Sequence, residues 1–260
     1  MSKYAFRDLG DAKQFLNIRI IRDPAACKLW LCQDAYIEKL LTKFHLESYH
    51  QGIDTPLSAS FTALPHDAQA TASQIMAYQQ RVGSLIYPAV VTRPDIAYAA
   101  AKLSQFNTNP SPDHLREANR CIAYLYNTRH LAIEYSSMPG PTDQVALGED
   151  FHAASDAAYA DDAVDRKSTQ GYLISLFGGP IAWQSGKQRT VTTSTTKAEL
   201  LALSHVGKEI QGLQRLFEQM QLGVDKASQI RCDNKQTVGI ATKEAHKLST
   251  RMRHVDVYQF

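Results

Sequence analysis

Hydrophobic and polar residues alternate near the start of the chain in a pattern typical of β-strands. Strands are expected at residues 15–22 (FLNIRIIR) and 28–33 (KLWLCQ), and the Asp23-Pro24 pair between them is a turn signal. We therefore expect a β-hairpin. From Asp34 onwards the apolar residues recur at helical spacing, which predicts an amphipathic helix.

The following hundred residues are predicted to be mainly helical. Residues 50–73 are polar and contain two prolines, which indicates an exposed loop. Three helical segments follow, at residues 73–89, 92–106 and 111–128. Pro94 and Pro112 stand where proline suits the first turn of a helix.

The pattern changes at residues 138–142 (MPGPT), which we interpret as a linker. Beyond it the chain favours strands and one long amphipathic helix. Strands are expected at residues 151–157, 171–177, 181–185 and 230–232, and helices at 195–220 and 236–242. This order predicts an α/β (α+β) protein, in which a helical region at 1–137 with a small hairpin precedes a mixed-sheet domain at 143–260.

Composition restricts the classes of protein that the chain can represent. The 260 residues carry a net charge of only +2, so nucleic-acid binding must depend on local basic patches. Cys27, Cys32, Cys121 and Cys232 include no C-x-x-C pair, which argues against a zinc site or a disulfide framework. No apolar run is long enough to span a membrane, and the N-terminus lacks a secretory signal. We expect an intracellular protein, cytoplasmic or nuclear, that is neither secreted nor inserted in a membrane.

Three acidic residues of the second region are candidate metal ligands. Asp156 lies within an expected strand, Glu199 in the first turns of the long helix, and Asp233 directly after the fourth strand. Carboxylates from strand ends and an adjoining helix converge in α/β sheets, and such a group holds Mg²⁺ or Mn²⁺. Taken singly, each has an ordinary alternative role as a turn residue, a helix cap or a partner of the helix dipole.

The ordered motifs of the chain resemble a known family. DLGDAKQFLNIRI, QQRVGSLIYPAVVTRPDIAYAAAKLSQF, DAAYADDAVDRKSTQGY, IAWQSGKQRTVTTSTTKAELLALS, IRCDNKQTVGIA and RMRHVDVYQF are similar, in the same order, to motifs of copia-type LTR retrotransposon polyproteins. The matching part is the C-terminal one, comprising the end of the reverse transcriptase, its thumb and connection, and the ribonuclease H domain. The resemblance covers nearly the whole chain.

The resemblance implies a function. Asp156, Glu199 and Asp233 match the ribonuclease H metal ligands, so the expected chemistry is hydrolysis of the RNA strand of an RNA–DNA hybrid with two Mg²⁺ or Mn²⁺ ions. Hybrid binding needs basic and hydroxyl groups that contact phosphates. The expected nucleic-acid-binding residues are Arg166, Lys167, Ser168, Thr169, Lys187, Arg189 and Asn234. A surface lysine or arginine is also commonly just a solvated charge.

The tetrad YADD at residues 159–162 has the same sequence form as the metal-binding motif of a reverse transcriptase. A polymerase hairpin needs apolar strands on both sides of the aspartates, but the residues that follow, 163–169 (AVDRKST), are polar and charged. By resemblance the tetrad lies in the loop after the first ribonuclease H strand. We therefore expect Asp161 and Asp162 to be loop residues, and no polymerase activity from this chain.

The chain departs from the family pattern in two ways. Lys197 stands where the family has a glutamate, two residues before the expected ligand Glu199. The family's last strand, last helix and fourth carboxylate are expected to be missing, and neither His254 nor Asp256 is expected to replace that carboxylate. The alternative hypotheses are a catalytically inactive nucleic-acid-binding or scaffold relic, and a subunit that completes a polymerase-bearing partner chain or forms a homo-oligomer.

Overall fold

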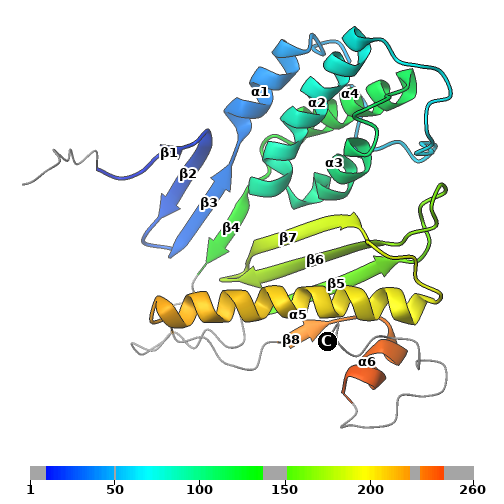
Figure 1. Ribbon diagram of the computed structural model, residues 1–260. Helices are drawn as coiled ribbons and strands as arrows, with labels where there is room; N and C mark the ends of the chain where they lie inside the picture. Colours follow the sequence, from blue (N-terminus) through cyan, green and yellow to red (C-terminus); the bar gives the residue numbers. More distant parts are fainter. Residues whose placement is uncertain (1–9, 50, 137–150, 223–228, 243–260) are drawn as a thin grey trace, which may run out of the picture.

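The computed structural model describes residues 10–49, 51–136, 151–222 and 229–242, which form two sheets and six α-helices (Figure 1). The elements of the first region are β1 (Gln14–Phe15), β2 (Ile18–Asp23), β3 (Lys28–Cys32), α1 (Asp34–Lys43), α2 (Ala72–Val91), the 3-10 helix η1 (Pro94–Ile96), α3 (Ala97–Ser104), α4 (Pro112–Asn127) and β4 (Ile133–Ser136). Those of the second are β5 (His152–Ala158), β6 (Thr169–Leu176), β7 (Gly179–Lys187), α5 (Thr195–Gln219), β8 (Gln229–Arg231) and α6 (Lys235–Ala241). The expected linker at 138–142, His254 and Asp256 lie outside the described residues.

The first sheet is antiparallel, with the strand order β1-β2-β3-β4. The expected hairpin is confirmed as β2 and β3, in which Ile20 is paired with Leu31. The strand expected at residues 15–22 begins only at Ile18, because Leu16 and Asn17 have positive φ and form a turn between β1 and β2. Strand β4 was not predicted. It pairs with β3 so that Trp30 lies opposite Glu134, and the Trp30 indole Nε1 donates a hydrogen bond of 2.7 Å to the Glu134 carboxylate.

The four helices of the first region share one apolar core, and the predicted helices are confirmed. Thr71 and Ser111 form the N-caps of α2 and α4, where each side chain accepts a hydrogen bond from a backbone N–H. Pro94 and Pro112 lie in first turns, as expected. The most deeply buried apolar side chains of this core include Ile37, Tyr78, Val82, Leu85, Ile96, Leu103, Ile122 and Leu125.

Pro88 lies inside α2, where it has no N–H to donate to the carbonyl oxygen of Ser84 one turn earlier. The hydroxyl of Tyr36, in α1, donates a hydrogen bond of 3.0 Å to that carbonyl oxygen. A side chain of a neighbouring helix thus satisfies the acceptor that the proline leaves free.

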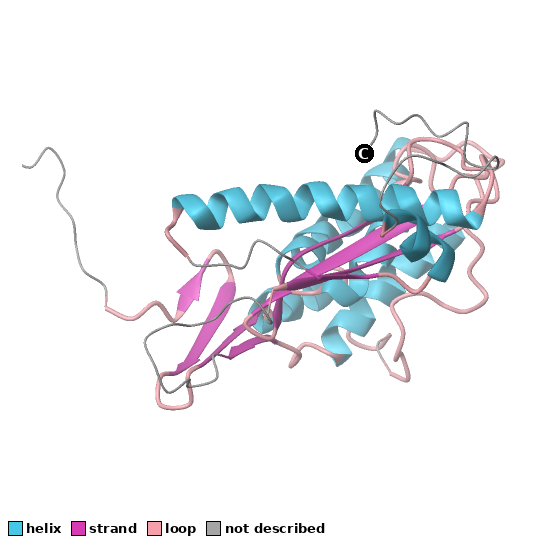
Figure 2. Ribbon diagram, turned by 90° about the horizontal axis from the view of Figure 1, so that it is seen from below, coloured by secondary structure: helices cyan, strands magenta, loops and turns pink. Residues whose placement is uncertain are grey.

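The second sheet has the order β7-β6-β5-β8, in which β5, β6 and β7 are antiparallel and β8 is parallel to β5. This confirms the expected mixed sheet. The long helix α5 packs along it (Figure 2), and its apolar stripe contributes Val206, Ile210 and Phe217 to a core with Phe151 and Ile174.

The helical region packs directly against the second sheet. In Figure 1 the strands β5, β6 and β7 lie between α5 and the helices α2 and α3. The backbone N–H of Ser136 bonds the Phe177 carbonyl oxygen at 2.9 Å, and Gly179 lies so close to β4 that a Cβ atom there would be 2.4 Å from the Glu134 carbonyl oxygen. Only glycine fits at this position. None of the described helices is both long enough and apolar enough to cross a bilayer.

Candidate metal centre

Asp156 projects from the middle of β5, and its side chain is exposed. Its partner on β6 is Gly171, so no side chain stands opposite the carboxylate. The rest of β5 is a run of small residues, which leaves space around this aspartate.

Glu199 lies in the second turn of α5, whose N-cap is Ser194. The glutamate is only 6% exposed. Burial raises the pKa of Glu199, and the nearby charges of Asp156 and Asp233 raise it further, while the backbone N–H of Ala157 and the thiol of Cys232 oppose the shift. The carboxylate therefore lies close to β5 and to the segment that follows β8.

Asp233 follows β8 directly and precedes α6. Ala154 is paired with Arg231 in the parallel register of β5 and β8, so Asp156 and Asp233 each lie two residues beyond that pair. The N-cap of α6 is Asn234, which accepts a hydrogen bond of 3.0 Å from the Thr237 backbone N–H.

Helix α6 is fastened to the start of α5. The Thr196 hydroxyl donates a hydrogen bond of 2.9 Å to the Gln236 side chain, and the Thr237 hydroxyl donates to the Thr196 carbonyl oxygen at 3.5 Å. These contacts fix the segment carrying Asp233 against the turn that carries Glu199.

The structure brings Glu199 and Asp233 together, with Asp156 near enough for its charge to raise the pKa of Glu199, and it adds a thiol that was not expected from the sequence. Ligand atoms of Glu199, Cys232 and Asp233 all lie within 4.8 Å of one another. The Cys232 thiol lies 3.9 Å from Glu199 Oε2, and the pKa of this thiol is raised by burial and by the charges of Glu199, Asp233 and Asp156. The only signal in the sequence was the position of Cys232 next to Asp233.

This donor set fits a hard divalent cation. Three carboxylates from separate elements supply oxygen ligands, and their mutual repulsion is relieved by positive charge. Asp156, Glu199 and Asp233 are the residues that could hold such an ion. The thiol of Cys232 is a softer ligand than the carboxylates within the same group.

The residues expected to bind nucleic acid differ in their surroundings. Arg166 and Arg189 are exposed. The remaining residues of this set have intramolecular partners: Lys167 pairs with Asp165, Ser168 is fully buried against Ala160 and Thr192, Thr169 bonds Asp161, Lys187 pairs with Asp162 and Asp165, and Asn234 caps α6.

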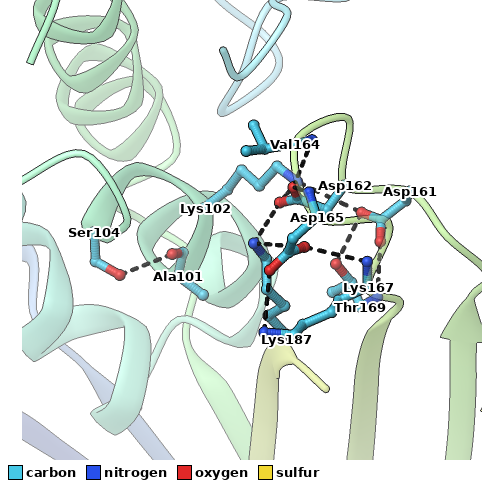
Figure 3. Close-up of polar contacts among 10 residues, drawn as sticks. All are labelled: Ala101, Lys102, Ser104, Asp161, Asp162, Val164, Asp165, Lys167, Thr169 and Lys187. Carbon is cyan, nitrogen blue, oxygen red and sulfur yellow. Dashed lines mark hydrogen bonds and ion pairs between the residues drawn. The ribbon is translucent and has the colours of Figure 1, made fainter. Parts of the chain in front are cut away.

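The aspartates of the YADD tetrad lie in the loop between β5 and β6, as expected, and form a network of ion pairs (Figure 3). Lys102 of α3 lies 3.6 Å from Asp161 and 3.7 Å from Asp162, measured from Nζ to the nearest carboxylate oxygen. The sequence reasoning did not identify Lys102, because nothing along the chain links it to residues sixty positions later.

The fold and the acidic group define a mixed α/β protein with a candidate metal centre made of carboxylates. The chain is 32% identical over 259 residues to the retrovirus-related Pol polyprotein from transposon TNT 1-94 of Nicotiana tabacum, a match that covers 98% of the chain and 18% of that protein. It is 32% identical over 260 residues to the Pol polyprotein from transposon RE1 of Arabidopsis thaliana, covering 99% of the chain and 17% of that protein. The chain belongs to the copia-type retrotransposon Pol polyproteins, and it spans less than a fifth of the length of these relatives.

A third relative is a protein of a different kind. The chain is 41% identical over 132 residues to the secreted RxLR effector protein 161 of Plasmopara viticola, a match that covers 51% of the chain and 87% of that protein. No family model matches the chain. No solved structure matches it either.

Proposed function

We propose that the chain is the ribonuclease H-like part of a retroelement Pol polyprotein, which hydrolyses the RNA strand of RNA–DNA hybrids with divalent metal ions. In this proposal residues 1–137 correspond to the end of the reverse transcriptase with its thumb and connection, and residues 143–260 to the ribonuclease H-like domain. The observation that supports the proposal is the cluster of Glu199, Cys232 and Asp233 at the start of α5 and the end of β8, with the charge of Asp156 on β5 near enough to raise the pKa of Glu199.

Asp156, Glu199 and Asp233 would hold Mg²⁺ or Mn²⁺, and two ions are expected. When bound, these ions activate a water molecule for attack on phosphorus and stabilise the leaving 3′-oxygen. The chain contributes fixed positions for the ligands: β5 holds Asp156 against a glycine, α5 buries Glu199, and α6 anchors Asp233.

The exposed Arg166 and Arg189 are suited to contact the phosphates of the hybrid. Lys167, Ser168, Thr169 and Lys187 contribute through the shape of the loop between β5 and β6, because their polar groups already have partners within it. Asn234 contributes in the same way as the cap of α6. Recognition of this kind depends on shape and charge more than on base sequence.

A hybrid-cleavage assay in Mg²⁺ and in Mn²⁺ tests the proposal, with Asp156→Asn as the test variant and Glu218→Gln as the control. Glu218 is an exposed carboxylate at the far end of the same helix, α5. Cleavage by the wild type and by the control, and its loss in Asp156→Asn, is the expected result. Equal cleavage by wild type and Asp156→Asn contradicts the mechanism based on three carboxylates.

The second candidate is a nucleic-acid-binding or scaffold protein without turnover. It is favoured by two exposed arginines, Arg166 in the loop from β5 to β6 and Arg189 just after β7, since such side chains can bind phosphates with or without catalysis. Salt-sensitive hybrid binding without cleavage in either metal identifies this function. Co-purification with a chain that carries a polymerase site would instead indicate a subunit of a larger polymerase.

A further inference from the structure

We propose that Lys102 is a positioning residue, which from helix α3 holds the loop between β5 and β6 and thereby sets the orientation of Asp156 and Arg166. The proposal rests on the juxtaposition of the Lys102 ammonium with Asp161 and Asp162 (Figure 3). It deepens the proposed function, because Asp156 and Arg166 are the groups assigned there to metal and phosphate binding.

The ammonium of Lys102 is buried at the boundary between the two regions. Lys102 is only 7% exposed, although it belongs to a helix and lysine normally extends into water. A buried lysine needs carboxylate partners, and Asp161 and Asp162 supply them from a loop about sixty residues later in the chain.

The network balances its charges. Lys187 of β7 lies 2.7 Å from Asp162 and 3.2 Å from Asp165, and Lys167 lies 3.1 Å from Asp165. Three ammonium groups therefore face three carboxylates, and Lys102 is the one that comes from the helical region. Its removal leaves one negative charge in excess beside the buried carboxylate of Asp162.

Asp161 transmits the contact with Lys102 to the β5–β6 hairpin. Its carboxylate accepts hydrogen bonds from the backbone N–H and the hydroxyl of Thr169, at 2.7 and 2.8 Å. Thr169 is paired with Ala158 at the end of β5, and Asp156 lies two residues before Ala158 in that strand. Three successive contacts thus connect Lys102 with the strand that carries the expected metal ligand.

Asp162 determines the path of the loop towards Arg166. Its carboxylate accepts hydrogen bonds from the backbone N–H groups of Val164 and Asp165, at 2.9 and 3.2 Å. Its carbonyl oxygen accepts from the Arg166 N–H at 3.1 Å, and Arg166 has a φ of 58°, in the left-handed region that side chains other than glycine seldom adopt. The position of Arg166 therefore depends on a carboxylate that Lys102 helps to hold.

Apolar packing does little to fix this loop. A cavity of about 310 Å³ is lined by Lys102 and Asp161, and a second of about 470 Å³ by Asp162 and Lys187. Val164, within the loop, is exposed. With open space on both sides, the ion pairs of Lys102 join the loop to α3.

The test compares Lys102→Met, which keeps the length of the side chain and removes its charge, with the double variant Lys102→Met/Asp161→Asn. The second substitution restores the charge balance and leaves an oxygen that still accepts the Thr169 N–H. Lys39→Met is the matched control, since Lys39 is an exposed lysine of helix α1.

In Lys102→Met we expect the KM and the Kd for an RNA–DNA hybrid to rise about fivefold or more, with circular dichroism unchanged and a smaller effect on kcat. The double variant should recover most of this loss. The backbone amide resonances of Thr169 and Gly171 should shift in Lys102→Met, shift back in the double variant, and stay in place in Lys39→Met.

The proposal is overturned if Lys102→Met lowers thermal stability but leaves the hybrid Kd and these amide resonances unchanged, or if Asp161→Asn recovers nothing. The resonances also separate the two proposals. If the wild-type chain neither binds nor cleaves hybrid, the proposed function fails, while the amide shifts still decide whether Lys102 positions the loop.

Discussion

The indole Nε1 of Trp183, in β7, donates a hydrogen bond of 2.6 Å to the carbonyl oxygen of Ala89, in the last turn of α2. Carbonyls in the last turn of a helix lack a partner within the helix, so a residue of the second sheet completes a helix of the first region. Trp183→Phe should lower the free energy of unfolding by about 1–3 kcal/mol, because the carbonyl loses its donor and a gap replaces part of the ring. Urea denaturation measures this loss.

Trp30→Phe is the matched control. Its indole also donates to an oxygen, but the acceptor is the exposed carboxylate of Glu134, which water can solvate when the donor is removed. A clearly smaller loss of stability is expected. Equal losses in the two variants would contradict a special role of Trp183 in joining the regions.

Tyr36 and Pro88 are linked through the carbonyl oxygen of Ser84, and this link can be tested directly. Tyr36→Phe removes the hydroxyl that donates to the Ser84 carbonyl oxygen and should cost about 1–2 kcal/mol of stability. In a Pro88→Ala background the alanine supplies the missing backbone N–H to the same carbonyl, so Tyr36→Phe should cost much less there. A double-mutant cycle by urea denaturation measures the difference, and additive effects would contradict the pairing.

The acidic group predicts opposite effects of one substitution with and without metal. In EDTA, Asp156→Asn should raise the melting temperature slightly, because one of three repelling carboxylates is neutralised. Wild-type protein should be stabilised by Mn²⁺, by about 2.7 kcal/mol at a concentration one hundred times the Kd, and the variant should lose this gain. Thermal unfolding at several Mn²⁺ concentrations tests both effects.

The exposed Glu218 again provides the control for this experiment. Glu218→Gln should behave as wild type in both conditions, because it lies in the last turns of α5, away from the first turns that carry Glu199. Stabilisation by Mn²⁺ that persists in Asp156→Asn would place the ion elsewhere on the protein.

The lowered pKa of Asp162 predicts how the stability of the protein depends on pH. Burial raises the pKa of this carboxyl, but the Lys187 ammonium and the N–H groups of Val164 and Asp165 outweigh burial and hold the pKa well below its usual range. Because the pKa is lower in the folded state, the stabilisation is complete above the unfolded value of about 3.9 and is lost as the pH falls through the folded value.

Asp162→Asn should therefore cost about 1–3 kcal/mol at pH 7, and the difference from wild type should shrink below about pH 4. Urea denaturation between pH 7 and pH 3 checks this trend. Asp113→Asn, which removes the exposed pair with Arg116, should change little at any pH. A difference that grows in acid would show that the sign of the Asp162 effect is wrong.

Local pattern was sufficient for most elements of the fold. Alternation predicted the hairpin of β2 and β3, and helical spacing predicted the helices from α1 to α5 within a few residues. Strand β4 was missed, since four residues carry little pattern of their own and their pairing with β3 joins positions about one hundred residues apart.

The candidate site was predictable in part. The order of Asp156, Glu199 and Asp233, together with the resemblance, selected the residues, but the parallel register of β8 against β5 brings the aspartates level with each other. The same register brought Cys232 to the group, although no cysteine spacing suggested it.

The sequence by itself determined most of the elements and the acidic residues, because helical and strand periodicities are local properties of the chain. The tertiary structure decided what those residues contact: it paired Lys102 with the tetrad aspartates and Trp183 with Ala89. Both contacts join segments that only folding brings together, and both satisfy polar groups that burial would otherwise leave without partners.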